Sequence, residues 1–321
     1  IVGCGGISSL HGKASQAAAD VRLVSCCDLR TERAEEFAKR YGCDSQYDNY
    51  RRMIHEQDLD GILLATWPNQ HREQVERCLD AGVRHILCEK ALALTGDEAR
   101  EIRDLVETAG ALLMEGFMYR HHPQWQRARQ IIAEGGVGEL RTIQTAFAYY
   151  NDDGQNIRNI ADIGGGGMMD IGCYAISLAR FLFDAEPDRV VGIVEYDETF
   201  GTDRLASAML DFGRGTSTFT CSTQLSPYQR VNIFGTTGRV EIEIPFNAPP
   251  DRPCLMWHET GGEIEQIEFP VCDQYTIQGE LMSRAILDDT PVPTPITDAV
   301  ANMQVIEAVF ESGRSGGWVA L

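Results

Sequence analysis

Two patterns of apolar positions alternate over the first 118 residues. Short, uninterrupted apolar runs are typical of buried strands in a parallel sheet, whereas apolar residues spaced three and four positions apart are typical of helices. The strands are expected at 21–27, 61–66, 85–88 and 111–114. The helices are expected at 9–19, 31–41, 97–108 and from a cap at Thr66 or Asn69 to Ala81. This repetition predicts an α/β fold with a doubly wound parallel sheet.

The pattern changes after Met118. Alternating strands are expected at 140–150, 189–197, 206–212, 216–223, 230–234 and 239–244. Helices are expected at 123–133, 168–183 and 297–311. Short turns between successive strands favour antiparallel pairing. We therefore expect two domains, a nucleotide-binding domain at 1–118 and an α+β domain at 119–321 with an open, mainly antiparallel sheet. The uncovered face of such a sheet suits pairing with further copies of the chain, as a homodimer or homotetramer.

Composition narrows the class of protein. The formal net charge of −20 argues against nucleic acid or an anionic membrane as a partner. No stretch reaches the roughly 18 apolar residues that a membrane span requires, and no signal-like segment precedes the first motif. Because the sequence opens inside an apparent strand, we expect a few residues before Ile1. The ten cysteines form no CxxC pair and no zinc-type spacing, so a reducing cytoplasm is the expected setting.

A glycine-rich turn stands between the first strand and the first helix. Its pattern is Gly3-x-Gly5-x-x-Ser8, and the next strand ends at Asp28, 25 residues after Gly3. In a dinucleotide-binding (Rossmann) unit, such glycines let a pyrophosphate approach the positive end of a helix, and the acid binds the ribose hydroxyls. The residues expected around the phosphates are Gly3, Gly5, Gly6, Ile7 and Ser8.

The choice between the two nicotinamide cofactors depends on residues 28–30. Asp28 favours NAD, because a carboxylate repels the 2′-phosphate of NADP. Arg30 keeps NADP open, since its guanidinium can pair with that phosphate, although it also suits an exposed helix start. Leu29 lies between them and is expected to border the same cofactor.

Two further strand ends carry candidate residues. In open α/β sheets, ligands bind outside the carboxyl ends of the strands. The strand at 85–88 ends in Glu89-Lys90, and Lys90 is one of only three lysines among 28 basic residues, which favours a specific role over that of a plain solvated cation. The cofactor-binding candidates after the strand at 61–66 are Thr66, Trp67, Pro68, Asn69 and His71.

A second group of candidates lies between the first two strands of the later domain. Arg158 ends an Asn-Ile-Arg sequence, and the glycine run 164–167 precedes a helix in which Asp170 and Tyr174 are four residues apart on one face. Taken alone, this pattern slightly favours an acid in the first helical turn and an aromatic residue of the core.

Six short motifs in this order resemble those of the glucose–fructose oxidoreductase / inositol dehydrogenase (Gfo/Idh/MocA) family. They are Gly3-x-Gly5-x-x-Ser8, Ala65-Thr66-x-Pro68-Asn69-x-His71, Glu89-Lys90, Phe117-Met118-Tyr119-Arg120-x-His122-Pro123, Asn156-Ile157-Arg158 and Gly166-x-x-x-Asp170-x-Gly172-x-Tyr174. The resemblance covers residues 1 to about 185. Tyr174 stands where inositol dehydrogenase-type members carry His, which is similar to the branch of xylose dehydrogenase and dihydrodiol dehydrogenase.

The resemblance implies a hydride transfer between nicotinamide and a sugar-like, polyol or cyclic hydroxyl substrate. It assigns Lys90 to a place beside the nicotinamide. Tyr174 is then the expected general acid/base, with Lys90 as the cation that lowers its pKa. Asp170 is expected to bind a substrate hydroxyl or to orient Lys90. Arg120 and Arg158 are candidate substrate contacts, with a structural role as the alternative for each.

One position departs from the family pattern, and two other functions stay open. Ala91 replaces the proline of the family's Glu-Lys-Pro, so the expected backbone restriction on Lys90 is absent. One alternative is a non-catalytic NAD(P)-binding sensor, of which the family has an example in a yeast galactose-pathway repressor. The other is an oxidoreductase that retains and recycles its cofactor, as glucose–fructose oxidoreductase does.

Overall fold

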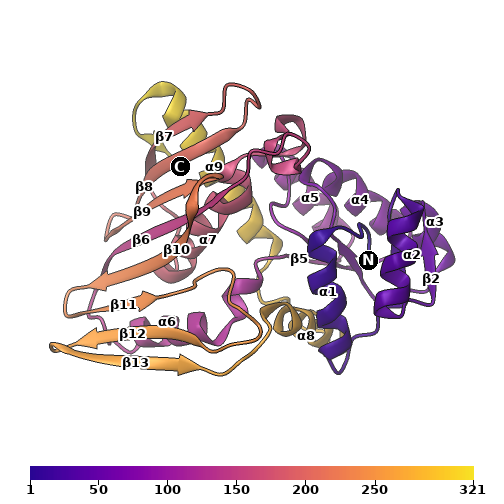
Figure 1. Cartoon of the computed structure of the whole chain (residues 1–321), viewed down its shortest axis with the longest axis horizontal. Helices are drawn as coiled ribbons and strands as arrows, with labels where there is room; N and C mark the ends of the chain where they lie inside the picture. The colour runs from indigo at the N-terminus through magenta and orange to yellow at the C-terminus, as the bar shows by residue number, and fades with distance from the viewer. The chain divides into compact units, whose positions relative to one another are not determined.

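The computed structural model describes all residues from 1 to 321, and the chain forms two compact units (Figure 1). The first unit contains 1–118 and 273–300, and the second contains 119–272 and 301–321. The first boundary lies after Met118, where the hydrophobic pattern changes. The expected division differs in one respect, because 273–300 returns to the first unit instead of staying in the second.

The first unit is built on parallel strands. They are β1 (Ser25–Cys27), β2 (Ser45–Tyr47), β3 (Ile62–Leu64), β4 (His85–Cys88) and β5 (Leu112–Glu115). Val2 forms parallel bridges to both Cys27 and Leu64 and so joins the β1–β2 pair to the β3–β4–β5 sheet. The resulting order, β2-β1-Val2-β3-β4-β5, confirms the doubly wound Rossmann arrangement.

Helices connect these strands. They are α1 (Gly6–Ala17), α2 (Thr31–Tyr41), α3 (Tyr50–Glu56), α4 (Pro68–Asp80) and α5 (Gly96–Thr108), with α8 (Gln274–Leu287) added from the returning segment. The expected side-chain cap of α4 is wrong. Trp67 occupies the N-cap position without a side-chain bond, and Pro68 begins the helix, where its fixed φ suits the first turn.

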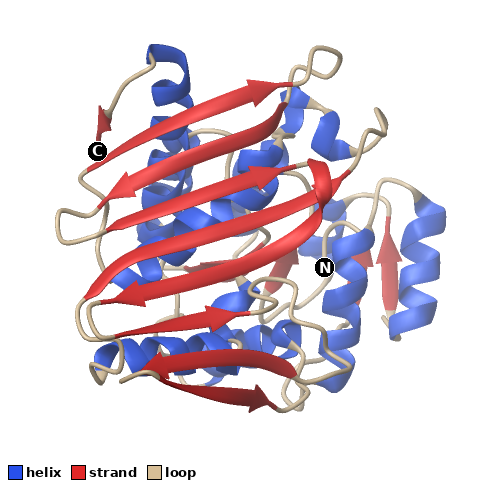
Figure 2. Ribbon diagram, turned by 60° about the vertical axis from the view of Figure 1, so that its left-hand side comes forward, coloured by secondary structure: helices blue, strands red, loops and turns tan.

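The second unit is built on one nine-stranded sheet (Figure 2). Its strands are β6 (Leu140–Tyr150), β7 (Arg189–Tyr196), β8 (Asp203–Asp211), β9 (Thr216–Ser222), β10 (Gln224–Gly235), β11 (Gly238–Ile242), β12 (Cys254–Thr260), β13 (Glu263–Phe269) and β14 (Val319–Ala320). All neighbouring pairs are antiparallel except β6–β9, which confirms a mixed, mostly antiparallel open sheet.

Helical segments of the second unit lie behind the sheet in the view of Figure 2, which leaves the face toward the viewer open. The helical segments of this part of the chain are η1 (Met118–His121), α6 (Pro123–Ala133), η2 (Ile157–Asn159), η3 (Ala161–Ile163), η4 (Met168–Gly172) and α7 (Cys173–Phe183). The final helix, α9 (Ile296–Ser315), begins in the first unit and ends in the second.

None of the helices combines the length and apolar composition needed to cross a membrane. The ten cysteines are all free.

The returning segment contributes to the core of the first unit. Met282 on α8 is 6% exposed and belongs to an apolar cluster with Leu87 of β4 and Met114 of β5. We expect Met282→Ala to lower the free energy of unfolding by about 2–5 kcal/mol, because it removes a buried side chain and leaves a cavity. Urea unfolding followed by circular dichroism measures this loss. Leu287→Ala, on the same helix but 67% exposed, is the matched control and should change stability by less than about 0.5 kcal/mol. Equal losses in both variants would contradict the role assigned to Met282.

Candidate active site

The candidate residues fall into two clusters, one in each unit, and the first begins at the glycine-rich turn. Gly3 has φ +89°, and a Cβ at this position would lie 2.5 Å from the Ala65 carbonyl oxygen. Gly5 is the N-cap of α1 and supplies no side-chain cap. A Cβ on Gly5 or Gly6 would meet no protein atom within 4 Å. The amides that start α1 therefore have open space beside them, which fits the pyrophosphate of a dinucleotide.

Asp28 is fixed at the end of β1 by two backbone amides. Its Oδ2 accepts from the Cys4 amide and its Oδ1 from the Arg30 amide, both at 2.9 Å. Leu29 beside it is 84% exposed, and Arg30 is also exposed. The turn thus offers a carboxylate, an apolar side chain and a guanidinium together, as the ribose and adenine end of a dinucleotide requires.

The cofactor-binding candidates in the turn after β3 differ in their surroundings: some are exposed, and others are bonded within the first unit. Trp67 is 41% exposed and Asn69 is exposed, so both remain candidates for contact with a cofactor, together with Pro68 between them. Thr66 donates its hydroxyl to Gln74 Oε1 at 2.6 Å and thereby ties the turn to α4.

His71 differs from its neighbours because its imidazole is fully buried. Nδ1 lies 3.0 Å from the Leu92 carbonyl oxygen and Nε2 lies 3.2 Å from the Thr66 carbonyl oxygen. Burial lowers the pKa of His71 and favours its neutral form. His71 thus joins two loops from inside the unit, and its expected cofactor contact stays a prediction.

Lys90 follows β4 in a loop supported by buried carboxylates. Glu89 Oε2 accepts from the Lys90 amide at 3.2 Å, and Glu115 Oε1 accepts from the Leu92 amide at 2.7 Å. The Lys90–Ala91 peptide bond is cis, and Ala91 is buried. These contacts hold the backbone on both sides of Ala91, where the family carries proline.

Glu89 itself points into the first unit, toward His11 of α1. Its Oε1 lies 2.6 Å from His11 Nε2, and both side chains are buried. The ring of Tyr275 on α8 packs edge-on against His11, with 5.2 Å between the ring centroids. The contact with His11 gives Glu89 a supporting role inside the unit, and its expected contact with the cofactor stays a prediction. Sequence reasoning missed His11, although its position one turn after Ser8 places both on one face of α1.

The second cluster surrounds Asp170. The segment expected as one helix over 168–183 begins with a π-helical turn, η4, in which Asp170 lies. Asp170 Oδ2 accepts from the Tyr149 hydroxyl at 2.6 Å and from Arg158 Nε at 2.8 Å. The Asp170 carboxylate is the main cause of a raised pKa at Arg158. Asp170 is therefore more than a first-turn acid, since it joins a phenol and a guanidinium from two other segments. Sequence reasoning missed Tyr149.

Tyr174 lies one turn further along, at the start of α7. It is 6% exposed, and its ring packs against three aromatic rings at centroid distances of 5.3–6.0 Å. These rings belong to Tyr119, Phe147 and Phe246. The ring of Tyr174 is thus part of the aromatic core of the second unit, which fixes the direction of its hydroxyl.

Arg120 was a candidate substrate contact, but it lies inside the second unit at 5% exposure. Its guanidinium donates to the hydroxyl and carbonyl oxygens of Ser177 and lies over the ring of Phe181. Arg120 therefore joins η1 to α7. Arg158, with its side chain 40% exposed, is the better placed of the two arginines for contact with a substrate.

Known proteins match the sequence over its full length. Residues 1–117 match the "Oxidoreductase family, NAD-binding Rossmann fold" and residues 125–241 match the "GFO/IDH/MocA C-terminal domain". An uncharacterized oxidoreductase of Rhizobium meliloti is 34% identical over 94% of this chain and 92% of its own. D-xylose 1-dehydrogenase (NADP(+)) 2 of Haloferax volcanii is 30% identical over 100% of this chain and 98% of its own. A 3-ketoreductase from Actinomadura kijaniata, solved in complex with NADP and TDP-benzene, superposes with a TM-score of 0.90 at 25% identity, covering 97% of this chain and 96% of that one.

The glycine-rich turn, the doubly wound sheet and these matches define the class of protein, an NAD(P)-dependent oxidoreductase with a Rossmann domain. The chain belongs to the Gfo/Idh/MocA family, which confirms the resemblance seen in its motifs.

Gly5 provides a direct test of the phosphate-binding turn. We expect Gly5→Ala to weaken NAD(P) binding by at least about tenfold, because its methyl group enters the space beside the α1 amides, while thermal stability stays unchanged. Isothermal titration calorimetry measures the binding. Gly279→Ala, at another open position of the first unit, is the control and should bind like the unmodified protein. Unaltered binding by Gly5→Ala would show that the phosphates do not lie at this turn.

Proposed function

We propose that this protein transfers hydride reversibly between NAD(P) and a hydroxyl-bearing carbon of a sugar, a polyol or a related cyclic substrate. The observation that carries the proposal is the phosphate-binding turn followed by the amide-held Asp28, because this arrangement suits a dinucleotide. The substrate class is supported by the full-length relative whose name specifies D-xylose. Asp28 makes NAD the favoured cofactor, and Arg30 leaves NADP open.

When bound, the nicotinamide would supply the carbon that accepts or returns the hydride. The protein must then move the proton of the substrate hydroxyl. Tyr174 is the proposed general acid/base, since its ring is fixed by the aromatic core. Lys90 is the proposed cation that favours the phenolate, because a nearby positive charge lowers the pKa of a phenol. The buried contacts of Glu89 and Glu115 support the backbone that presents Lys90.

Asp170 is the proposed acceptor for a second substrate hydroxyl. Its Oδ2 already accepts from Tyr149 and Arg158, which stabilises the ionised carboxylate and limits its rotation. A carboxylate held in one orientation discriminates between hydroxyl positions on a sugar ring better than a mobile one does. Arg158 carries the remaining donors of this group and is the proposed contact for a ring or hydroxyl oxygen.

The activity is tested by following absorbance at 340 nm with NAD⁺ and with NADP⁺ against a panel of aldoses, polyols and cyclic diols. Reduction with at least one sugar-like compound is the expected result, faster with NAD⁺. Tight cofactor binding with no reduction of any compound would favour the sensor function. Cofactor that stays with the protein through gel filtration would favour an oxidoreductase that recycles it.

Lys90 is the decisive residue for the proposed chemistry. We expect Lys90→Met to cut turnover at least about a hundredfold, because it removes the charge that favours the phenolate, and to leave cofactor affinity within a few-fold. Steady-state kinetics and calorimetry measure the two effects. Lys39→Met is the control, since Lys39 lies exposed near the end of α2 and should leave both unchanged. Full turnover in Lys90→Met would refute the assignment.

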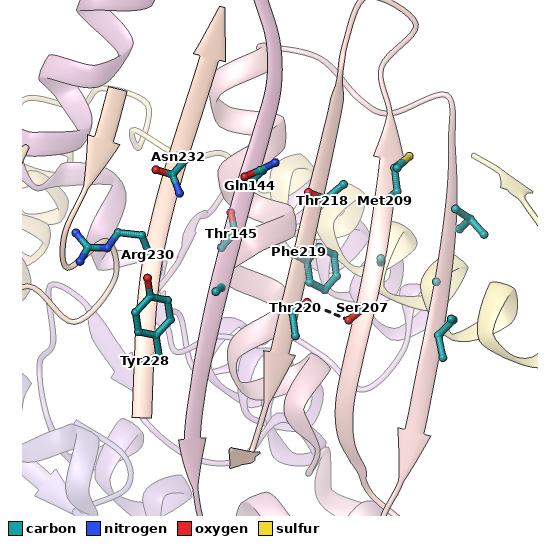
Figure 3. Close-up of a pocket in the computed structure, with 15 residues that line it drawn as sticks. Gln144, Thr145, Ser207, Met209, Thr218, Phe219, Thr220, Tyr228, Arg230 and Asn232 are labelled. Carbon is teal, nitrogen blue, oxygen red and sulfur yellow. Dashed lines mark hydrogen bonds between the residues drawn. The ribbon is translucent and has the colours of Figure 1, made fainter. Parts of the chain in front are cut away.

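The open face of the nine-stranded sheet is the proposed contact between copies of the chain (Figure 3). The face presents hydroxyl-bearing side chains, including Ser207, Thr220 and Tyr228, and Ser207 and Thr220 share a hydrogen bond of 3.0 Å. Ile193 on the same face is 78% exposed. A second copy suits this surface, because hydroxyl groups both donate and accept and so pair with themselves across a twofold axis.

Oligomeric state is tested by light scattering over a range of concentrations. We expect a dimer or tetramer, and we expect Ile193→Arg to raise the dissociation constant at least about tenfold by placing a charge in the contact. Leu287→Arg changes a residue that is also exposed but lies on α8, and it should assemble normally. A monomeric protein, or equal assembly of both variants, would remove this proposal.

A further inference from the structure

Asp203, the first residue of β8, lies against the start of the segment that carries Asp170 and Tyr174. It is 3% exposed, and its Oδ2 accepts from the Met168 amide at 2.6 Å. The first turn of η4 has no side-chain cap from its own N-cap residue, Gly167. Asp203, 35 residues away in sequence, therefore supplies the acceptor that a helix start normally receives from a neighbouring residue.

The glycine run before η4 has a physical explanation in this contact. Gly166 has φ +113°, and a Cβ there would overlap Asp203 Oδ1. A Cβ on Gly167 would lie 3.2 Å from Asp203 Oδ2. The backbone can close on the Asp203 side chain because Gly166 carries no Cβ, and the absence of a side chain at Gly167 relieves a further tight contact. Gly166, Gly167 and Asp203 thus together determine where η4 begins.

We propose that Asp203 is a positioning residue, whose buried side-chain oxygen fixes the turn at 166–172 and through it the orientation of Asp170 and Tyr174. The kinetic consequence rests on the function proposed above. Asp203 is separate from the contacts of Tyr149 and Arg158, which hold Asp170 at its carboxylate, because Asp203 acts on the backbone that precedes it.

Because Asp203 is buried, the free energy needed to open the turn to water depends on pH. Burial raises the pKa of Asp203 from 3.8 to about 7, against the opposite effect of the amides of Met168 and Gly167. The titratable groups that face it are Asp170 of η4, Tyr196 of β7 and Cys221 of β9. The closed turn retains a proton that a solvated carboxyl would release. Opening the turn to water therefore becomes easier as the pH rises from 3.8 to about 7, and changes little above that.

Hydrogen–deuterium exchange of the full-length protein, read by mass spectrometry over residues 166–172, tests the proposal without any substrate. Asp203→Ala removes the acceptor, so we expect exchange in this segment to become about fivefold faster, with the rest of the chain unchanged. Asp203→Asn keeps one acceptor oxygen and carries no charge, so we expect it to restore most of the protection and to abolish the pH dependence. Asp211→Ala, at the other end of β8, is the matched control and should leave the segment unchanged.

The kinetic measurement separates positioning from general support of the fold. We expect Asp203→Ala to lower kcat about tenfold with cofactor affinity unchanged, and Asp203→Asn to recover it, because a misplaced reacting group slows the chemical step. Unchanged exchange at 166–172, uniform loosening of the whole chain, or unchanged kcat in Asp203→Ala would each overturn the proposal. If Asp203→Ala does not fold, the proposal is tested by the pH dependence of exchange at 166–172. This dependence should be present in the unmodified protein and lost in Asp203→Asn. Absence of turnover in the unmodified protein would instead refute the proposed function, and the exchange data would still test Asp203.

Discussion

Acidic side chains that accept from distant backbone amides hold three of the loops that carry candidate chemistry in this protein. Asp28 holds the amide of Cys4, Glu115 holds that of Leu92, and Asp203 holds that of Met168. In each case the acid stands at the end of a strand, and its partner lies more than twenty residues away. A loop amide withdrawn from water needs an acceptor, and each of these acidic side chains provides an oxygen for it. The strands thus determine where the loops lie.

The dependence of loops on partners remote in sequence also explains which features could be predicted from the sequence. Motifs that act through the local backbone were predictable, because their requirements lie within a few residues. Gly3 needs a positive φ, and Asp28 ends a short apolar run, so the turn and the strand were both foreseen. The long strand β6 and the helix α6 were also foreseen, since each has a clear period of its own.

Side-chain direction could not be predicted, because it depends on partners that are remote in sequence. Glu89 and Arg120 stand in motifs beside candidate residues, yet Glu89 turns toward His11 and Arg120 toward Ser177. The strand β13 was missed for a different reason. It forms an edge of the sheet and consists mainly of exposed polar residues, so it lacks the apolar alternation that identifies a strand. Asp203 was missed because a single acid at the start of a strand has no distinguishing pattern.

The return of 273–300 to the first unit has a consequence for how the protein is made. The Rossmann strands are translated early, whereas α8 is translated only after most of the chain. Until then Leu87 and Met114 lack the contact of Met282, and the nascent protein carries an uncovered apolar surface. The core of the first unit is therefore complete only after α8 has been translated.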